Sequence, residues 1–445
     1  MTDLTGNGPG GLALLTATEA AARLESGEIT SEALVRDCLD RIAAREPDVG
    51  AWAFIDPDYA LEQARARDAT PRLSALHGVP VGIKDIIDTA DMPTGHGSPI
   101  YAGVRTGRDA ACVAAMRAAG MVIMGKTVTT EFASPYPAHT RNPHDTERTP
   151  GVSSSGSGAA VADFHVPLAN GTQTGGSVIG PAASCGVYGY KASLDGLDRG
   201  GIRHCKPSID TLGLFGRSMD DLILLRAASL GHRDAPRAAR VANEPPRIGL
   251  CRTHGWDQAE TCTRTAIEGA AKLLADAGAS VREVDLPDAV IEVEPEFNVL
   301  NSWEGAIALA AEARDRLDSF NPWNRERVEY ARTLTEERYI EAKRRLAAAR
   351  AALAPLFDGC DVLLTPSLAG EAPLGIEGVR SSVFNRMWTQ MYTPCATLPL
   401  FEGPNAMPVG IQIIGRGEAD DSLLGDAAWI DAAIRRALGM VPARV

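Results

Sequence analysis

From residue 78 onward, short apolar runs alternate with alanine-rich runs, and this alternation limits the folds open to the chain. The runs 78–84 and 121–124 predict strands, and the segment 110–119 between them predicts a helix that Gly120 closes. Further strands are expected at 247–251, 281–286 and 361–365, and further helices at 265–277 and 336–353. This alternation of expected strands and helices indicates an α/β fold whose sheet is covered by helices on both faces.

The first 75 residues are expected to be helical. Thr16 and Glu19 have the spacing of a capping box, which predicts a helix that ends near Gly27. A second helix should open at Thr30 or Ser31, and its apolar residues recur on one face. We therefore expect this helix to pack against a larger body.

The charge balance excludes some partners. With a formal net charge of −13, the chain lacks the basic face that binding to nucleic-acid phosphates requires. No apolar run reaches the ~18 residues that cross a bilayer, so no membrane partner is expected. The eight cysteines are scattered singly, which is typical of core residues in a reducing compartment. We expect a soluble, cytoplasmic protein.

Two segments of small residues, 151–158 and 171–177, dominate the pattern. Neither has the ending of a phosphate-binding loop or the three-glycine spacing of a dinucleotide site, and we expect no cofactor and no metal. Ser177 is not in a Gly-x-Ser-x-Gly elbow, because Ile179 stands where the last glycine should be. No serine lies three residues before any of the six lysines, which excludes a Ser-x-x-Lys pair.

The remaining arrangement is Lys84 in a strand, Ser153 in the first small-residue segment and Ser177 in the second. It resembles the amidase signature family. Ordered matches outside the two segments extend the resemblance over roughly residues 15 to 435; they lie at 80–85, 126–132, 142–151, 181–186, 364–366 and 408–412.

The resemblance implies one large α/β domain, 1–445, with a central mixed β-sheet covered by α-helices on both faces. Its parts would be an N-terminal helical region at 1–75, a catalytic core at 76–230, a variable and pocket-forming region at 231–355, and the C-terminal part of the core at 356–445.

By position in the motifs, Ser177 matches the family's nucleophile, Ser153 its proton relay and Lys84 its base. Lysine can act as a base only when it is neutral, so desolvation or nearby positive charge must lower its pKa. Arginine could not replace it, because arginine does not deprotonate in proteins. The resemblance also implies an oxyanion hole made by the backbone N–H groups of Thr174, Gly175, Gly176 and Ser177.

The family further implies a cis peptide between Val152 and Ser153, although Val152 stands where the family has glycine. A cis bond before a residue other than proline costs roughly 3 kcal/mol, and small neighbours should help to accommodate it.

The chain departs from the family at two positions, with Gln173 for the usual Asp and Ile179 for the usual Arg. Losing both charges together avoids leaving one of them buried and unpaired. No Lys or Arg occurs between Arg148 and Lys191, so we expect an uncharged substrate. Tyr136, Ile179 and Gly180 are the candidate substrate-binding residues.

The resemblance favours hydrolysis of a small aryl or alkyl amide, or of a carbamate (urethane), with a possible esterase side activity. One alternative is an amidotransferase subunit that supplies ammonia within a complex. Another is an inactive binding protein of the same fold. The expected partner of the hydrolase is its small-molecule amide or carbamate substrate. A homodimer is possible.

Overall fold

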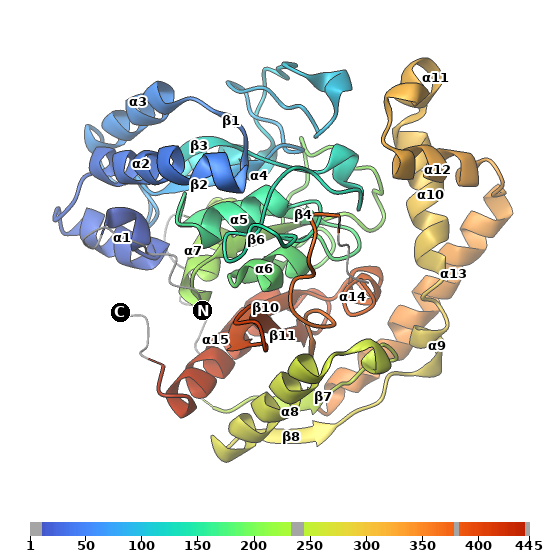
Figure 1. Ribbon diagram of the computed structural model, residues 1–445. Coiled ribbons are helices and arrows are strands. Elements are labelled where there is room, and N and C mark those ends of the chain that lie inside the picture. The colour runs from blue at the N-terminus through green and yellow to red at the C-terminus, as the bar shows by residue number, and fades with distance from the viewer. Residues whose placement is uncertain (1–10, 233–243, 378–381, 441–445) are drawn as a thin grey trace.

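Eleven strands form one mixed sheet in the computed structural model, which describes residues 11–232, 244–377 and 382–440 (Figure 1). Their order across the sheet is β1-β3-β2-β4-β6-β5-β10-β11-β9-β7-β8. The strands are β1 (Trp52–Ile55), β2 (Pro80–Lys84), β3 (Val122–Thr127), β4 (Leu168–Gln173), β5 (Tyr188–Lys191), β6 (Thr211–Gly216), β7 (Arg247–Leu250), β8 (Ser280–Glu283), β9 (Val362–Pro366), β10 (Cys395–Glu402) and β11 (Pro408–Gly415). Strand β2 is parallel to β3 and β4, β7 is parallel to β8 and β9, and the other pairs are antiparallel.

Helices surround this sheet. The α-helices are α1 (Ala17–Glu25), α2 (Ser31–Val49), α3 (Pro57–Asp68), α4 (Ala111–Ala118), α5 (Ser155–Ala162), α6 (Ile179–Cys185), α7 (Met219–Ser229), α8 (Thr261–Asp276), α9 (Asp288–Ile291), α10 (Glu296–Ala308), α11 (Ala310–Arg316), α12 (Pro322–Ala331), α13 (Glu336–Leu353), α14 (Arg386–Gln390) and α15 (Asp420–Ala437). Short 3-10 helices are η1 (Leu12–Leu14), η2 (Pro99–Tyr101), η3 (Glu131–Ala133), η4 (Trp256–Gln258), η5 (Leu317–Ser319) and η6 (Ala354–Asp358).

The sheet has a core on each face, because successive residues of a strand point to opposite sides. Val81 and Ile83 of β2 belong to the apolar cluster that also holds residues of α4, α7, α8 and α15. On the other face lie α5 and α6, whose buried residues cluster with Met124 of β3 and Ala169 of β4. Lys84 points to this second face, where its amine meets Ser153. The predicted mixed sheet with helices on both faces is confirmed.

Local signals at the N-terminus also hold in the structure. The hydroxyl of Thr16 accepts a hydrogen bond from the backbone N–H of Glu19 at 3.1 Å, and the Glu19 carboxylate accepts one from the backbone N–H of Thr16 at 2.9 Å. This confirms the capping box of α1. Helix α2 begins at Ser31 with Thr30 as its cap, as expected, and buries one apolar face.

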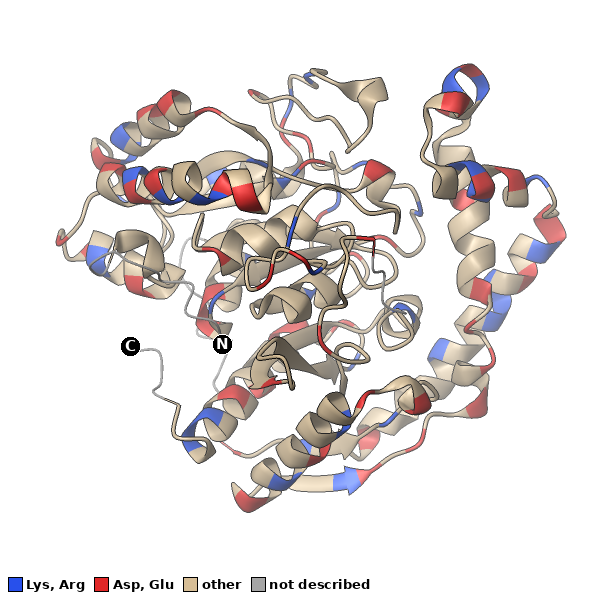
Figure 2. Ribbon diagram, in the orientation of Figure 1, with Lys and Arg blue, Asp and Glu red and all other residues tan. Residues whose placement is uncertain are grey.

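Helices α10, α12 and α13 stand along one side of the sheet (Figure 1), and α10 packs against both of the others. Helix α13 carries both acidic and basic residues, and so do other outer helices (Figure 2). None of the helices in the described ranges is both long and apolar enough to cross a bilayer.

Candidate active site

The amine of Lys84 lies at the centre of the site, at the end of β2. Its Nζ is 2.5 Å from the Oγ of Ser153 and donates a hydrogen bond to the Oγ1 of Thr172 at 2.8 Å. Lys84 is completely buried. The backbone N–H of Lys84 donates to the side-chain oxygen of Asn170 at 3.0 Å, which ties β2 to β4 beside the amine. The structure therefore brings together Lys84 and Ser153, as the motifs predict.

Burial is the main reason that the pKa of Lys84 is lowered well below its ordinary value. Of the charged neighbours, Asp210 raises this pKa and Lys206 lowers it. No carboxylate in the described ranges forms an ion pair with the Lys84 amine, so nothing strongly holds the proton on it. A neutral amine at 2.5 Å from a hydroxyl can accept that hydroxyl's proton.

Lys126 is the other lysine in a motif segment, and its surroundings differ. Its Nζ donates hydrogen bonds to the carbonyl of Ile87 at 2.8 Å and to the hydroxyl of Thr94 at 2.7 Å. It also forms an ion pair with Asp85 at 3.5 Å. Lys126 thus holds the loop after β2 in place, and we interpret it as structural.

Side-chain hydrogen bonds attach the first small-residue segment to β4. The hydroxyl of Ser154 donates to the carbonyl of Thr172 and accepts from its N–H, at 3.2 and 3.3 Å. Gly156 must be glycine, because a Cβ there would lie 2.3 Å from the backbone nitrogen of Val128. Small residues let the start of α5 approach the sheet closely, and this places Ser153 over Lys84.

The expected cis peptide before Ser153 is wrong. No peptide bond in the described residues is cis. The chain instead turns through positive backbone angles, with φ of 95° at Gly151 and 59° at Ser153. Such a turn keeps the trans bond that non-proline residues strongly prefer.

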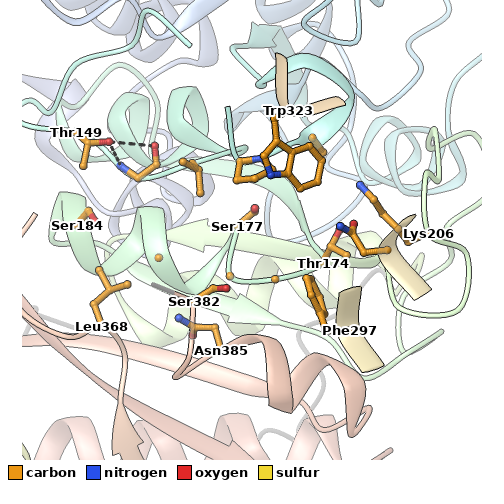
Figure 3. A pocket seen from close by; sticks show the side chains of 18 of the residues that line it. Thr149, Thr174, Ser177, Ser184, Lys206, Phe297, Trp323, Leu368, Ser382 and Asn385 are labelled. Atoms are coloured by element: carbon orange, nitrogen blue, oxygen red, sulfur yellow. Dashed lines mark hydrogen bonds between the residues drawn. The ribbon is translucent and has the colours of Figure 1, made fainter. Parts of the chain in front are cut away.

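Ser177 lies in the turn between β4 and α6, with 8% of its surface exposed. It lines a cavity together with Gly151 and Val152, the residues just before Ser153. Ser177 and Ser153 both lie in the described ranges, and their hydroxyls are not hydrogen-bonded to each other. The structure thus shows the contact between Lys84 and Ser153, and it places Ser177 at the adjoining cavity surface (Figure 3).

The side chain of Gln173 organises the turn that carries Ser177. Its oxygen accepts hydrogen bonds from the backbone N–H groups of Val178 at 2.9 Å and Ile179 at 3.1 Å. The four preceding N–H groups, those of residues 174–177, donate to no acceptor in the described ranges. Thr174, Gly175, Gly176 and Ser177 all line the cavity, so these N–H groups remain available to a bound oxygen.

Two of the three candidate substrate-binding residues lie elsewhere. Ile179 is fully buried in an apolar cluster with Ile209, because it stands on the inward side of α6. Tyr136 is 43% exposed and lines a separate depression beside His139, although Ala133 and Pro135 of the same loop line the cavity with Ser177. Gly180 does line the cavity.

Other parts of the cavity wall come from segments that the motifs did not mark. Phe297 and Asn301 come from α10 and Trp323 from α12, within the region 231–355. Asn385, at the start of α14, donates from its side chain to the carbonyl of Ser367 at 2.9 Å, while its Oδ1 is buried without a partner in the described ranges.

Lys206 also lines the cavity (Figure 3). It lies outside the segment without Lys or Arg on which the uncharged-substrate expectation rested. Its one sequence signal was the scarcity of lysine, since only six of the 44 basic residues are lysine.

A buried Lys and Ser pair beside a Gly-Gly-Ser turn, on a mixed α/β sheet, defines the amidase signature class of enzymes. The family model described as Amidase matches residues 33–424, and the chain belongs to this family.

Relatives differ in what they do. The chain is similar to a subunit of the glutamyl-tRNA(Gln) amidotransferase of Acidothermus cellulolyticus, at 35% identity over 95% of both chains. It is 31% identical to the 2-amino-5-chloromuconic acid deaminase of Comamonas testosteroni, over 94% of this chain and 96% of the relative. The solved peptide amidase from Stenotrophomonas maltophilia superposes with a TM-score of 0.83, at 27% identity over 95% of this chain and 97% of that chain.

Proposed function

We propose that this amidase cleaves the C–N bond of a small amide through an acyl-enzyme on Ser177. The contact between the Lys84 amine and the Ser153 hydroxyl carries this proposal, because it provides a desolvated base and a relay next to Ser177. The unpaired N–H groups of residues 174–177 add the donors that a developing oxyanion needs.

In the first half of the reaction, the Ser177 oxygen attacks the carbonyl carbon of the amide. The Ser177 proton moves to Ser153, whose own proton moves to the neutral Lys84. The carbonyl oxygen gains negative charge and accepts hydrogen bonds from the N–H groups of residues 174–177. When the C–N bond breaks, the proton returns through Ser153 to the leaving nitrogen, and the amine departs.

In the second half, water attacks the carbonyl carbon of the acyl-enzyme and loses a proton through Ser153 to Lys84. When the ester C–O bond to Ser177 breaks, the proton returns through Ser153 to the Ser177 oxygen. The products are a carboxylic acid and free Ser177. Asn385 supports this assignment, because its unpartnered Oδ1 borders the cavity beside Gly176 and can accept the N–H of an amide. A carbamate has the same carbonyl geometry and remains within the proposal, as does an ester side activity.

The absence of Lys and Arg near Ser177 in the sequence no longer supports the expectation of an uncharged substrate. That expectation rested on the absence of a cation near the nucleophile turn, whereas the fold brings Lys206 to the cavity. The cavity therefore does contain a cation that a charged substrate could contact.

A second candidate function is that of an amidotransferase subunit. It is favoured by the likeness to a glutamyl-tRNA(Gln) amidotransferase chain over nearly the full length of both proteins. Such a subunit would release ammonia from an amide donor and act within a complex. The homodimer and the cytoplasmic location remain predictions from the sequence.

The test is turnover by the purified chain alone. A panel of amides, anilides, carbamates and esters is assayed for release of ammonia, amine or alcohol, with Ser177→Ala as the matched control. We expect the wild type to hydrolyse at least one amide or carbamate and Ser177→Ala to be inactive. Turnover that persists in Ser177→Ala would contradict the proposal, and activity only with added subunits would favour the second candidate.

A further inference from the structure

Lys206 is a cation in the cavity, and no Asp or Glu among the described residues lines that cavity beside it. Only 4% of its surface is exposed, and its Nζ makes no hydrogen bond or ion pair with any residue of the described ranges. Figure 3 shows its side chain on the same side of Ser177 as Trp323 and Phe297. Because Lys206 lines the cavity, a ligand that supplies negative charge to its ammonium group would be favoured there.

The neighbouring carboxylates are occupied by other groups. One oxygen of Asp210 accepts the backbone N–H groups of Cys205 and Lys206 at 2.9 and 2.8 Å, and the other accepts the hydroxyl of Thr174. Glu304 accepts the backbone N–H of Ser208 at 3.0 Å and the hydroxyl of Tyr339 at 2.8 Å. Asp210 thus fixes the backbone at Lys206, while the Lys206 amine has no partner among the described residues.

Asn301 adds a second unused donor at the same end of the cavity. Its Nδ2 is buried and has no hydrogen-bond partner in the described ranges, and only 4% of the residue is exposed. Asn301 and Lys206 line the cavity together with Trp323. The Cε of Lys206 also lies 4.0 Å from where a Cβ of Gly305 would stand, one helical turn after Asn301.

We propose that Lys206 and Asn301 bind a carboxylate of the substrate, so that the amide cleaved at Ser177 carries a carboxylate away from its scissile bond. An ammonium and an amide N–H together satisfy the two oxygens of a carboxylate, and no acidic side chain lines this cavity within the described ranges to repel it. The Thr149, Ser184 and Leu368 side chains border the cavity on the other side of Ser177, away from Lys206 (Figure 3). This inference rests on the proposed function, because it assigns the substrate class of the same site.

The test uses pairs of amides that differ only in a carboxylate. Glutaramic acid is compared with pentanamide, which places the carboxylate in the acyl part. N-acetyl-β-alanine is compared with N-propylacetamide, which places it in the amine part. For at least one pair, we expect the wild type to prefer the carboxylate by about tenfold or more in kcat/KM, as a charge-assisted hydrogen bond implies.

Lys206→Met should remove most of this preference, and Asn301→Leu should reduce it. The ratio within a pair is the readout, because Lys206 also lowers the pKa of Lys84 and its loss would alter turnover of both members alike. Lys272→Met is the matched control, since Lys272 is an exposed lysine paired with Asp276. Preference for the neutral member in both pairs, or an undiminished ratio in Lys206→Met, would overturn the inference.

Labelling of Ser177 by a fluorophosphonate separates this inference from the proposed function. If the wild type is labelled but shows no carboxylate preference, the inference fails and the proposed function stands. If the active wild type is not labelled at Ser177, the proposed function fails as well. Glutarate should also slow the labelling of wild type and not that of Lys206→Met, which measures carboxylate binding without turnover.

Discussion

The Nζ of Lys84 lies 2.5 Å from the Oγ of Ser153, although the two residues are 69 positions apart in the chain. Strand β2 ends at Lys84, and the segment before α5 is attached to the neighbouring β4, so both side chains meet on one face of the sheet. A buried lysine would otherwise be a cost to stability, and this contact makes it a base with the Ser153 hydroxyl within reach.

Lys84→Arg should abolish turnover at every pH. Arginine keeps the positive charge but cannot become neutral in a protein, so it cannot accept the proton from Ser153. We expect kcat/KM to fall at least about 10³-fold, within the range for loss of a general base. Circular dichroism and thermal unfolding check that the variant folds. Activity retained in a folded Lys84→Arg protein would place the base elsewhere.

The activity should rise with pH through the pKa of Lys84. Below that pKa the amine is protonated and cannot act as a base, and above it the amine is neutral and active. Because burial lowers this pKa well below the ordinary lysine value, the rising limb of kcat/KM should lie well below the pH at which a free lysine titrates.

The same pH profile has an internal check. Lys206 lowers the pKa of Lys84, so Lys206→Met should move the rising limb to higher pH, whereas Lys272→Met should leave it in place. A rising limb at the ordinary lysine value in the wild type would contradict a desolvated base.

Ser153→Ala should cause a large but incomplete loss of activity. The relay disappears while Lys84, Ser177 and the N–H groups of residues 174–177 remain, so a water molecule can carry the proton less efficiently. We expect kcat to fall about 10²- to 10⁴-fold. Steady-state kinetics of the folded variant measures this effect, and unchanged kcat would remove Ser153 from the proton path.

Gln173→Met should destabilise the protein. The variant leaves the N–H groups of Val178 and Ile179 buried without their acceptor, which costs roughly 2–4 kcal/mol for two such groups. Urea unfolding gives the change in the free energy of unfolding. Gln258→Met, at an exposed position, is the matched control and should change it little. Equal effects of the two substitutions would contradict the capping role of Gln173.

The sequence predicts the fold and the candidate residues Lys84, Ser153 and Ser177 because their signals are local. Strand and helix periodicity places Lys84 at the end of a strand, and the resemblance of the small-residue segments to the family's motifs identifies Ser153 and Ser177. Close backbone contacts require glycine at positions such as Gly156, so the glycines of the first small-residue segment reflect the geometry of the site.

The region 231–355 was expected to form part of the pocket, but the individual residues of the cavity walls could not be predicted in the same way. Asn301, Trp323 and Lys206 reach Ser177 only through the packing of α10, α12 and the segment before β6, which no local pattern encodes. Tyr136 lines a separate depression although Ala133 and Pro135 of its loop line the cavity, and Ile179 lies on a helix face that points inward, so neither side chain reaches the cavity.

Labelling by a fluorophosphonate followed by peptide mapping is the most direct test that Ser177 is the nucleophile. The probe phosphonylates a serine only when a base activates it, so its site reports the nucleophile. We expect one modified residue, Ser177, with labelling lost in Ser177→Ala and strongly slowed in Lys84→Arg. A catalytically active protein that is modified at another residue, or not at all, would show that Ser177 is not the nucleophile.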